Sequence, residues 1–204
     1  MIRQRSSLVF VLLLFASVTQ AITISVPKDQ PTIQNAIYAA SDGDEVIVST
    51  GIYKETITLS GKNIILRSIN PTDKEIIRAT IIDGNGKGSV ITLTGIEDET
   101  CVLSGFTITN GNSINGGGIN GNGSSAIIEH CLIIANSSIS LLANANGGGI
   151  YGSNGIIQYN TIRGNSVEAL SGSRVTANGG AISDCNGIIR NNIITNNFAY
   201  APSA

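Results

Sequence analysis

The stretch that decides the fold begins as Gly116-Gly-Gly-Ile119 and returns as Gly147-Gly-Gly-Ile150 and Gly179-Gly-Ala-Ile182. Each copy continues into a β-branched run that ends in asparagine, at residues 126–136, 155–165 and 187–197. The isoleucines that close the glycine-rich segments are 31 and 32 residues apart. A fixed period of this length is typical of stacked supersecondary units, each of which needs its neighbours to bury its apolar face.

The three copies and the segment before them can be aligned on these runs. If each copy is one rung of a stack, each aligned position becomes a column that holds one residue from every rung. Two inward columns are apolar: Leu103, Ile128, Ile157 and Ile189, and Ile108, Ile133, Ile162 and Ile194. A third column holds Phe106, Cys131, Asn160 and Asn192. Asn136, Asn165 and Asn197 recur at one turn, where stacked amides can hydrogen-bond along the axis and tolerate a left-handed backbone. We therefore predict an all-β solenoid with an isoleucine core and an asparagine ladder.

The chain before the repeat consists mostly of short β-rich runs bounded by Gly, Asn or Asp. They are residues 22–26, 45–49, 56–59, 63–67, 77–82 and 89–93. Between the first two, Ile33, Ala36, Ile37 and Ala40 share one helical face. Pro31 suits the first turn of this helix, and Asp42-Gly43 supplies its end. We predict one short amphipathic helix that caps the open end of the stack, and no further helix after it.

Two segments between the later rungs are polar and rich in Ser, Ala and Asn. They are residues 137–146 and 166–178. We expect them to leave the stack on one edge as loops, which in solenoids often line the binding face.

Length and composition bound the possible functions. The 204 residues suffice for one domain, and with 42% hydrophobic but only 4% aromatic residues the core must be aliphatic. The net charge of −2 gives no basic footprint, so a nucleic-acid partner is not expected. Cys101, Cys131 and Cys185 are odd in number and lack zinc-site spacing, so we expect small core residues with at least one thiol unpaired.

Residues 1–21 form a separate module. Arg3 and Arg5 precede an apolar run at residues 8–15 that is too short to span a bilayer, and Thr19-Gln-Ala21 offers small residues for cleavage. This pattern predicts a signal peptide, hence a secreted, extracellular or cell-envelope protein without a later membrane span. The predicted organisation is a signal peptide at 1–21, an N-terminal strand and capping helix at 22–56, and β-helix rungs at 57–204.

The final residues, 198–204, stop where another insertion would begin, and no capping element follows. A bare solenoid end leaves apolar core and strand edges exposed. We therefore expect the β-helix to be truncated at its C-terminal end, or to be covered there by a partner.

Several segments resemble right-handed parallel β-helix proteins of the pectate-lyase-like superfamily. Residues 31–55 are similar to the helix-capped start of these proteins, including pectin methylesterases. Ile81-Ile-Asp-Gly-Asn-Gly86 and the Gly-Gly-Gly-Ile segments resemble bacterial exported β-helix repeat proteins. Gly179-Gly-Ala-Ile182 is also similar to the repeat of chlamydial polymorphic outer-membrane proteins. The resemblance implies a right-handed parallel β-helix, with polysaccharide or cell-surface components as partners.

The catalytic signatures of these relatives are missing from the sequence. Glu129, Glu168 and Asp184 are the only acidic residues after Thr100, and no two of them share a column in adjacent rungs. The paired-Asp and Gly-His-Gly motifs of polygalacturonases and the Asp-Phe-Ile-Phe-Gly and Leu-Gly-Arg-Pro-Trp motifs of pectin methylesterases do not occur. We therefore predict a non-catalytic surface or polysaccharide-contacting role. The alternative is a polysaccharide lyase or pectin-esterase-like enzyme whose site is cryptic or missing.

The candidate binding residues face outward from the rungs. Asn120, Tyr151 and Ser183 follow the isoleucine of each glycine-rich segment and form a polar column, where Tyr151 can stack on a sugar ring. Arg163 and Arg190 lie on separate columns, and a lyase would need such a basic group beside a bound uronate. The alternative for all five is an ordinary half-exposed or solvated position on the solenoid surface.

Two further features have a structural and a functional interpretation. His130, the only histidine, shares a bend with Gly105, Tyr159 and Asn191, where we expect a structural or solvated turn rather than a ligand or base. Glu97-Asp-Glu99 could hold Ca²⁺, but no neighbouring ligand set supports this cofactor, so we expect a solvated acidic turn.

Overall fold

The computed structural model describes residues 20–141, 143–170 and 175–202. The predicted signal peptide lies outside this range except for its last two residues. No helix within these ranges has the length and apolar character needed to span a bilayer.

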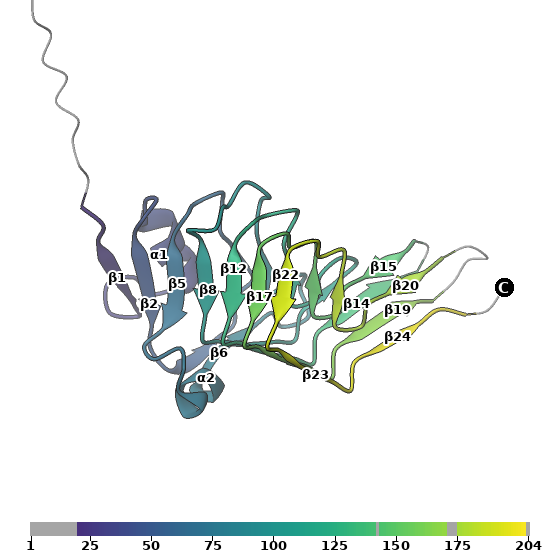
Figure 1. The fold of residues 1–204 in the computed structure, drawn as a ribbon. Coiled ribbons are helices and arrows are strands. Elements are labelled where there is room, and N and C mark those ends of the chain that lie inside the picture. The colour runs from purple at the N-terminus through teal and green to yellow at the C-terminus, as the bar shows by residue number, and fades with distance from the viewer. Residues whose placement is uncertain (1–19, 142, 171–174, 203–204) are drawn as a thin grey trace, which may run out of the picture.

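Three sheets of stacked parallel strands form the body of a right-handed parallel β-helix, as predicted (Figure 1). Sheet A holds, in spatial order, β1 (Thr23–Val26), β2 (Glu45–Val48), β5 (Ile65–Ser68), β8 (Val102–Ser104), β12 (Ile127–Glu129), β17 (Ile156–Gln158) and β22 (Ile188–Arg190). Sheet B holds β3 (Gly51–Tyr53), β6 (Thr80–Asp83), β9 (Thr107–Thr109), β13 (Leu132–Ile134), β18 (Thr161–Arg163) and β23 (Ile193–Thr195). Sheet C holds β4 (Ile57–Thr58), β7 (Ile91–Thr92), β11 (Ile119–Asn120), β16 (Ile150–Tyr151) and β21 (Ile182–Ser183).

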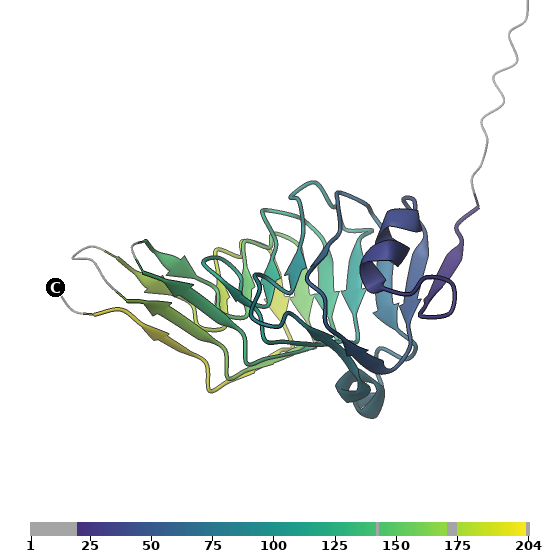
Figure 2. The same ribbon diagram turned by 180° about the vertical axis from the view of Figure 1, so that it is seen from behind.

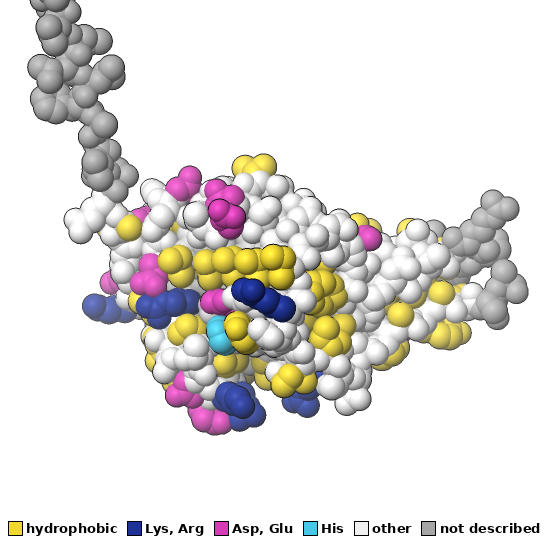
Figure 3. All heavy atoms as spheres, in the orientation of Figure 1, with side chains coloured by type: hydrophobic (Ala, Val, Ile, Leu, Met, Phe, Trp, Pro, Cys, Tyr) yellow, Lys and Arg dark blue, Asp and Glu magenta, His cyan; other side chains and the backbone are white. Residues whose placement is uncertain are grey.

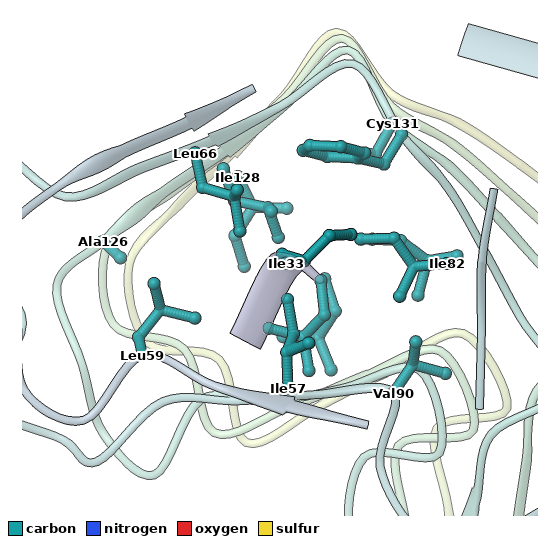
Figure 4. Packing of buried hydrophobic residues seen from close by; sticks show 14 of the residues in the cluster. Ile33, Ile57, Leu59, Leu66, Ile82, Val90, Ala126, Ile128 and Cys131 are labelled. Carbon is teal, nitrogen blue, oxygen red and sulfur yellow. The ribbon is translucent and has the colours of Figure 1, made fainter. Parts of the chain in front are cut away.

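The core is the inside of this tube. Leu103, Ile128, Ile157 and Ile189 pair in register across sheet A, and Ile108, Ile133, Ile162 and Ile194 do so across sheet B, which confirms both predicted columns. The buried members of both columns meet the side chains of sheet C at the centre, where Ile128 and Ile57 point toward one another (Figure 4). Ile189 and Ile194, in the last rung, are 43% and 46% exposed. Cys101 and Cys131 are buried and Cys185 is partly buried, and all three are free thiols.

The predicted helix is α1 (Ile33–Ala39), and it lies across the N-terminal end of the stack (Figures 1 and 4). Ile33, Ala36 and Ile37 are fully buried in the common core. Thr32 is the N-cap, because its side chain accepts a hydrogen bond from the backbone N–H of Asn35. Pro31 therefore precedes the cap and does not occupy the first turn as expected.

The expectation of no further helix was wrong. α2 (Lys74–Ala79) occupies part of the segment expected to be a strand at residues 77–82, and only its second half is extended, as β6. The cause is local: Asp73 caps the helix by accepting from the backbone N–H of Glu75, and Glu75 pairs with Arg78 three residues later. α2 lies outside the tube, over sheet B (Figure 1).

Residues 137–146 and 166–178 leave the stack on one edge, as expected, but the expectation that they are loops was wrong where the structure describes them, which excludes residues 142 and 171–174. These segments contain strands that extend the rungs sideways into a thin projection, which we call the fin (Figures 1 and 2). Its outgoing strands form sheet D: β10 (Asn112–Ser113), β14 (Ser137–Ser140), β19 (Ser166–Ala169) and β24 (Phe198–Tyr200). Its returning strands form sheet E: β15 (Ala145–Asn146) and β20 (Ala177–Asn178). Small buried side chains fill the space between the layers: Ser138, Ser140, Ala145, Val167 and Ala169.

The predicted asparagine ladder is present. Asn136 donates from Nδ2 to Oδ1 of Asn165 at 3.0 Å, and Asn165 donates to Oδ1 of Asn197 at 2.9 Å. Other turns use the same device without having been predicted as ladders: Asn160 with Asn192, Asn115 with Asn146 and Asn178, and Asn154 with Asn186. Stacked amides therefore stabilise four turns of the rung.

Candidate functional site

A hollow of about 380 Å³ opens where α2 overhangs the corner between sheets A and B. We call it the α2 cleft. Its lining residues come from α2 and its approach, from the corner, and from sheet B: Thr72, Lys74, Ile77, Arg78, His130, Cys131, Leu132, Tyr159, Thr161 and Arg163. The volume lies within the range of small-molecule sites in proteins.

The corner places two aromatic rings in the cleft. Gly105, His130, Tyr159 and Asn191 all turn the chain with positive φ, which confirms the column expected at this bend. Gly105 must be glycine, because a Cβ there would clash with Pro71 on the approach to α2. The chain that leads to α2 thus crosses the corner at Gly105. The next two rungs carry His130 and Tyr159 at the same position, and their rings stack with centroids 5.1 Å apart and planes at 8°. Tyr159 is 50% exposed, so its ring is accessible to a ligand.

Hydrogen bonds to sheet B hold α2 over this corner. The Thr107 hydroxyl donates to the carbonyl oxygen of Ile77 at 2.8 Å, and the Thr80 hydroxyl donates to that of Ile76 at 2.8 Å. These bonds fix the C-terminal end of α2, so that Lys74 and Arg78 line the cleft opposite the corner.

Positive charge dominates the cleft. Arg78 donates to Glu75 at 2.6 Å, but both side chains are more than half exposed, so this pair contributes little. Within the described residues, Lys74 and Arg163 form neither an ion pair nor a side-chain hydrogen bond. Lys and Arg side chains lie around the histidine on this face of the molecule (Figure 3). Two unpaired cations beside an exposed ring can attract an anion and stack on a ligand ring.

Cys131 also lines the cleft, but its thiol is not a nucleophile. Burial raises its pKa to about 12, so the thiol stays protonated at neutral pH.

The cleft contains only one of the five predicted site residues, Arg163. Arg190 lies on the outer face of sheet A, where its Nε donates to Gln158 at 2.9 Å and Gln158 donates in turn to Glu129 at 2.7 Å. A row of aliphatic side chains runs beside this polar column (Figure 3): Ile65, Val102, Ile127, Ile156 and Ile188.

Asn120, Tyr151 and Ser183 pair in register on sheet C, as predicted, and are all partly buried. Burial raises the pKa of Tyr151, and the neighbouring negative charge of Asp184 raises it further. No residue of this column lines the α2 cleft.

The Glu97-Asp-Glu99 turn is not wholly solvated, contrary to the expectation. Glu97 is only 2% exposed and accepts hydrogen bonds from Thr94, Gly95 and Gly61. Burial alone would raise its pKa, but these hydrogen bonds outweigh that effect and lower it. The carboxylate oxygens of Glu97 therefore connect two rungs. No group of three His, Cys, Asp or Glu side chains in the described residues is placed to hold a metal ion.

The sequence did not point to Lys74, Arg78 or Tyr159 as site residues. Asp73, followed by Glu75 and by Arg78 three residues after it, is a helix-start pattern that could have revealed α2 and its two basic residues. The chain matches no model of a known protein family and no curated protein.

Proposed function

We propose that this β-helix protein contacts an acidic polysaccharide through the α2 cleft, and that it is exported to the cell envelope or the extracellular space. The observation that carries the proposal is the pairing of two unpartnered cations, Lys74 and Arg163, with the exposed ring of Tyr159. A carboxylate on a sugar would meet the cations, and the sugar ring would stack on the tyrosine.

We propose a binding role rather than a catalytic one. Among the described residues that line the cleft there is no Asp or Glu. Glycoside hydrolysis needs two carboxylates that act on the bond. The single thiol of the cleft is protonated, as described above.

A lyase is the second candidate, because the cleft brings Arg163 together with Lys74 and His130. The His130 imidazole could remove a proton beside a bound uronate, while Lys74 and Arg163 stabilise the negative charge on its carboxylate. Incubation with polygalacturonate distinguishes the candidates: a lyase generates unsaturated products that absorb ultraviolet light, whereas a binding protein leaves the polymer intact.

Calorimetric titration tests the binding role with polygalacturonate as the acidic probe and dextran as the neutral one. We expect binding to polygalacturonate only, weakened by salt. The double variant Lys74→Ala/Arg163→Ala should bind at least about tenfold more weakly, because each lost charged hydrogen bond costs about 1.5–3 kcal/mol.

The matched control is Lys28→Ala/Lys54→Ala, which removes the same charge from two exposed lysines away from the cleft. Its affinity should stay within about twofold of that of the unmodified protein. An equal loss in both double variants, or no binding to polygalacturonate at all, would refute the proposal.

A further inference from the structure

A second hollow lies at the opposite edge of sheet B, where the rungs bend into the fin. Its volume is about 310 Å³, and its lining includes Asn85, Asn110, Asn112, Ala135 and Ser137. No Lys or Arg lines it. We call it the amide hollow.

Two of its amide side chains are free to bind a ligand. Asn85 and Asn112 are exposed, and their side-chain amides form no hydrogen bond within the described residues. The turn that carries Asn85 is nonetheless held, because Asp83 Oδ1 accepts from the backbone N–H of Asn85 at 2.8 Å and from Nδ2 of Asn110 at 3.1 Å. An amide offers both a donor and an acceptor, which suits sugar hydroxyl groups.

The two hollows meet on one rung. Cys131 and Leu132 line the α2 cleft, and Ala135 and Ser137, which follow β13, line the amide hollow. Ala135 is three positions after Leu132, about 10 Å of extended chain. Arg163 pairs with Ile134, one of the two residues between them, and also lines the cleft.

We propose that the amide hollow is a second subsite for hydroxyl groups of the same polysaccharide, which therefore crosses sheet B along its strands, perpendicular to the axis of the β-helix. The acidic group binds in the α2 cleft, and a unit further along the chain binds Asn85 and Asn112. This inference rests on the proposed function, because it needs the first contact in the cleft.

The test compares galacturonate monomer with its hexamer in calorimetric titrations. The hexamer should bind the unmodified protein at least about tenfold more tightly than the monomer, because it reaches both hollows. In Asn85→Ala/Asn112→Ala, hexamer affinity should fall about tenfold, the loss of one or two hydrogen bonds, while monomer affinity is unchanged. Both residues are exposed, so the unfolding midpoint should fall only by the small cost of alanine at the left-handed φ of 51° of Asn85.

Asn35→Ala is the control, because it removes another exposed amide, on α1, that has no hydrogen-bond partner among the residues that the structure describes. A hexamer that binds no more tightly than the monomer, or that is insensitive to the Asn85→Ala/Asn112→Ala change, overturns the second subsite. If Lys74→Ala/Arg163→Ala still weakens binding in that case, only this inference fails. If neither ligand binds the unmodified protein, the proposed function fails with it.

Discussion

At the scale of single residues, the asparagine ladder shows how burial changes the role of one side chain. Asn165 is fully buried, and its amide serves several partners at once. Oδ1 accepts from the backbone and side-chain nitrogens of Asn136, and Nδ2 donates to Asn197 and to the carbonyl oxygen of Ile133. Asn178 makes a similar ladder bond to Asn146 at 2.9 Å, but at an exposed position.

We expect Asn165→Ala to lower the free energy of unfolding by about 3 kcal/mol, because the buried backbone N–H of Asn136 and the carbonyl oxygen of Ile133 each lose their bond to its amide. Asn178→Ala should cost less than about 1 kcal/mol, because water replaces its bonds. Urea denaturation followed by circular dichroism measures both. Equal costs would contradict the view that burial determines the strength of the ladder.

At this scale the sequence predicts what repeats and misses what does not. The isoleucine columns, the Asn136 ladder and the shared bend of His130 and Tyr159 all follow from aligning copies of one unit. Lys74 and Arg78 have no counterpart in any copy, and they line the same cleft as His130 only because α2 crosses the corner. Column alignment therefore identifies the corner of the site but not the charges that face it.

At the scale of elements, α1 is attached to the stack at both ends. The Glu55 carboxylate accepts from the backbone N–H groups of Ile33 and Gln34 in its first turn. The Lys62 ammonium donates to the carbonyl oxygens of Ile37, Tyr38 and Ala40 at 2.8, 2.9 and 2.6 Å. These charges complement the helix dipole, so rungs that follow the helix in sequence hold it as a cap.

Lys62→Met keeps the apolar stem and removes the charge. We expect a loss of about 2 kcal/mol in the free energy of unfolding, because three carbonyl groups at the end of α1 lose a charged donor. Lys54→Met changes an exposed lysine whose ammonium has no partner in the described part of the chain, and it should cost less than about 0.5 kcal/mol. Denaturant titrations compare the two variants, and a Lys62→Met protein as stable as the Lys54→Met protein would show that the ammonium does not hold the helix.

The fin and α2 were predicted incorrectly, and each error has a physical reason. The strands of the fin are rich in Ser, Ala and Asn, which have low β-propensity, and they are extended because each stacks on the same segment of the neighbouring rung. The segment at residues 77–82 carries the isoleucines of a strand, but the Asp73 cap makes its first part helical. Local propensity thus decided α2, whereas stacking decided the fin.

At the scale of the whole molecule, the glycine run and the asparagine turn that define the repeat meet at the junction between the tube and the fin, which we call the neck. There the outgoing and returning strands pass so closely that a Cβ on Gly117, Gly148 or Gly180 would clash with the outgoing strand of the next rung, at Ser137, Ser166 and Phe198 respectively. A Cβ on Gly118 would lie 3.0 Å from the Asn136 amide, and one on Gly149 would lie 3.3 Å from that of Asn165. The repeat therefore encodes the junction between tube and fin as well as the rungs.

Gly148→Ala tests this account of the neck. The new methyl group would meet the carbonyl oxygen of Gly180 at 2.6 Å and clash with that of Ser166, so backbone must move in two rungs. We expect a loss of about 3 kcal/mol in the free energy of unfolding, as for other overpacked sites.

Gly51→Ala is the matched control for this change, because its methyl group would lie against the Tyr53 ring at 3.4 Å, an ordinary contact. Its stability should stay within about 0.5 kcal/mol of that of the unmodified protein. If both variants unfold at the same urea concentration as the unmodified protein, the glycine run is not needed for close passage, and its conservation from copy to copy within the chain must have another cause.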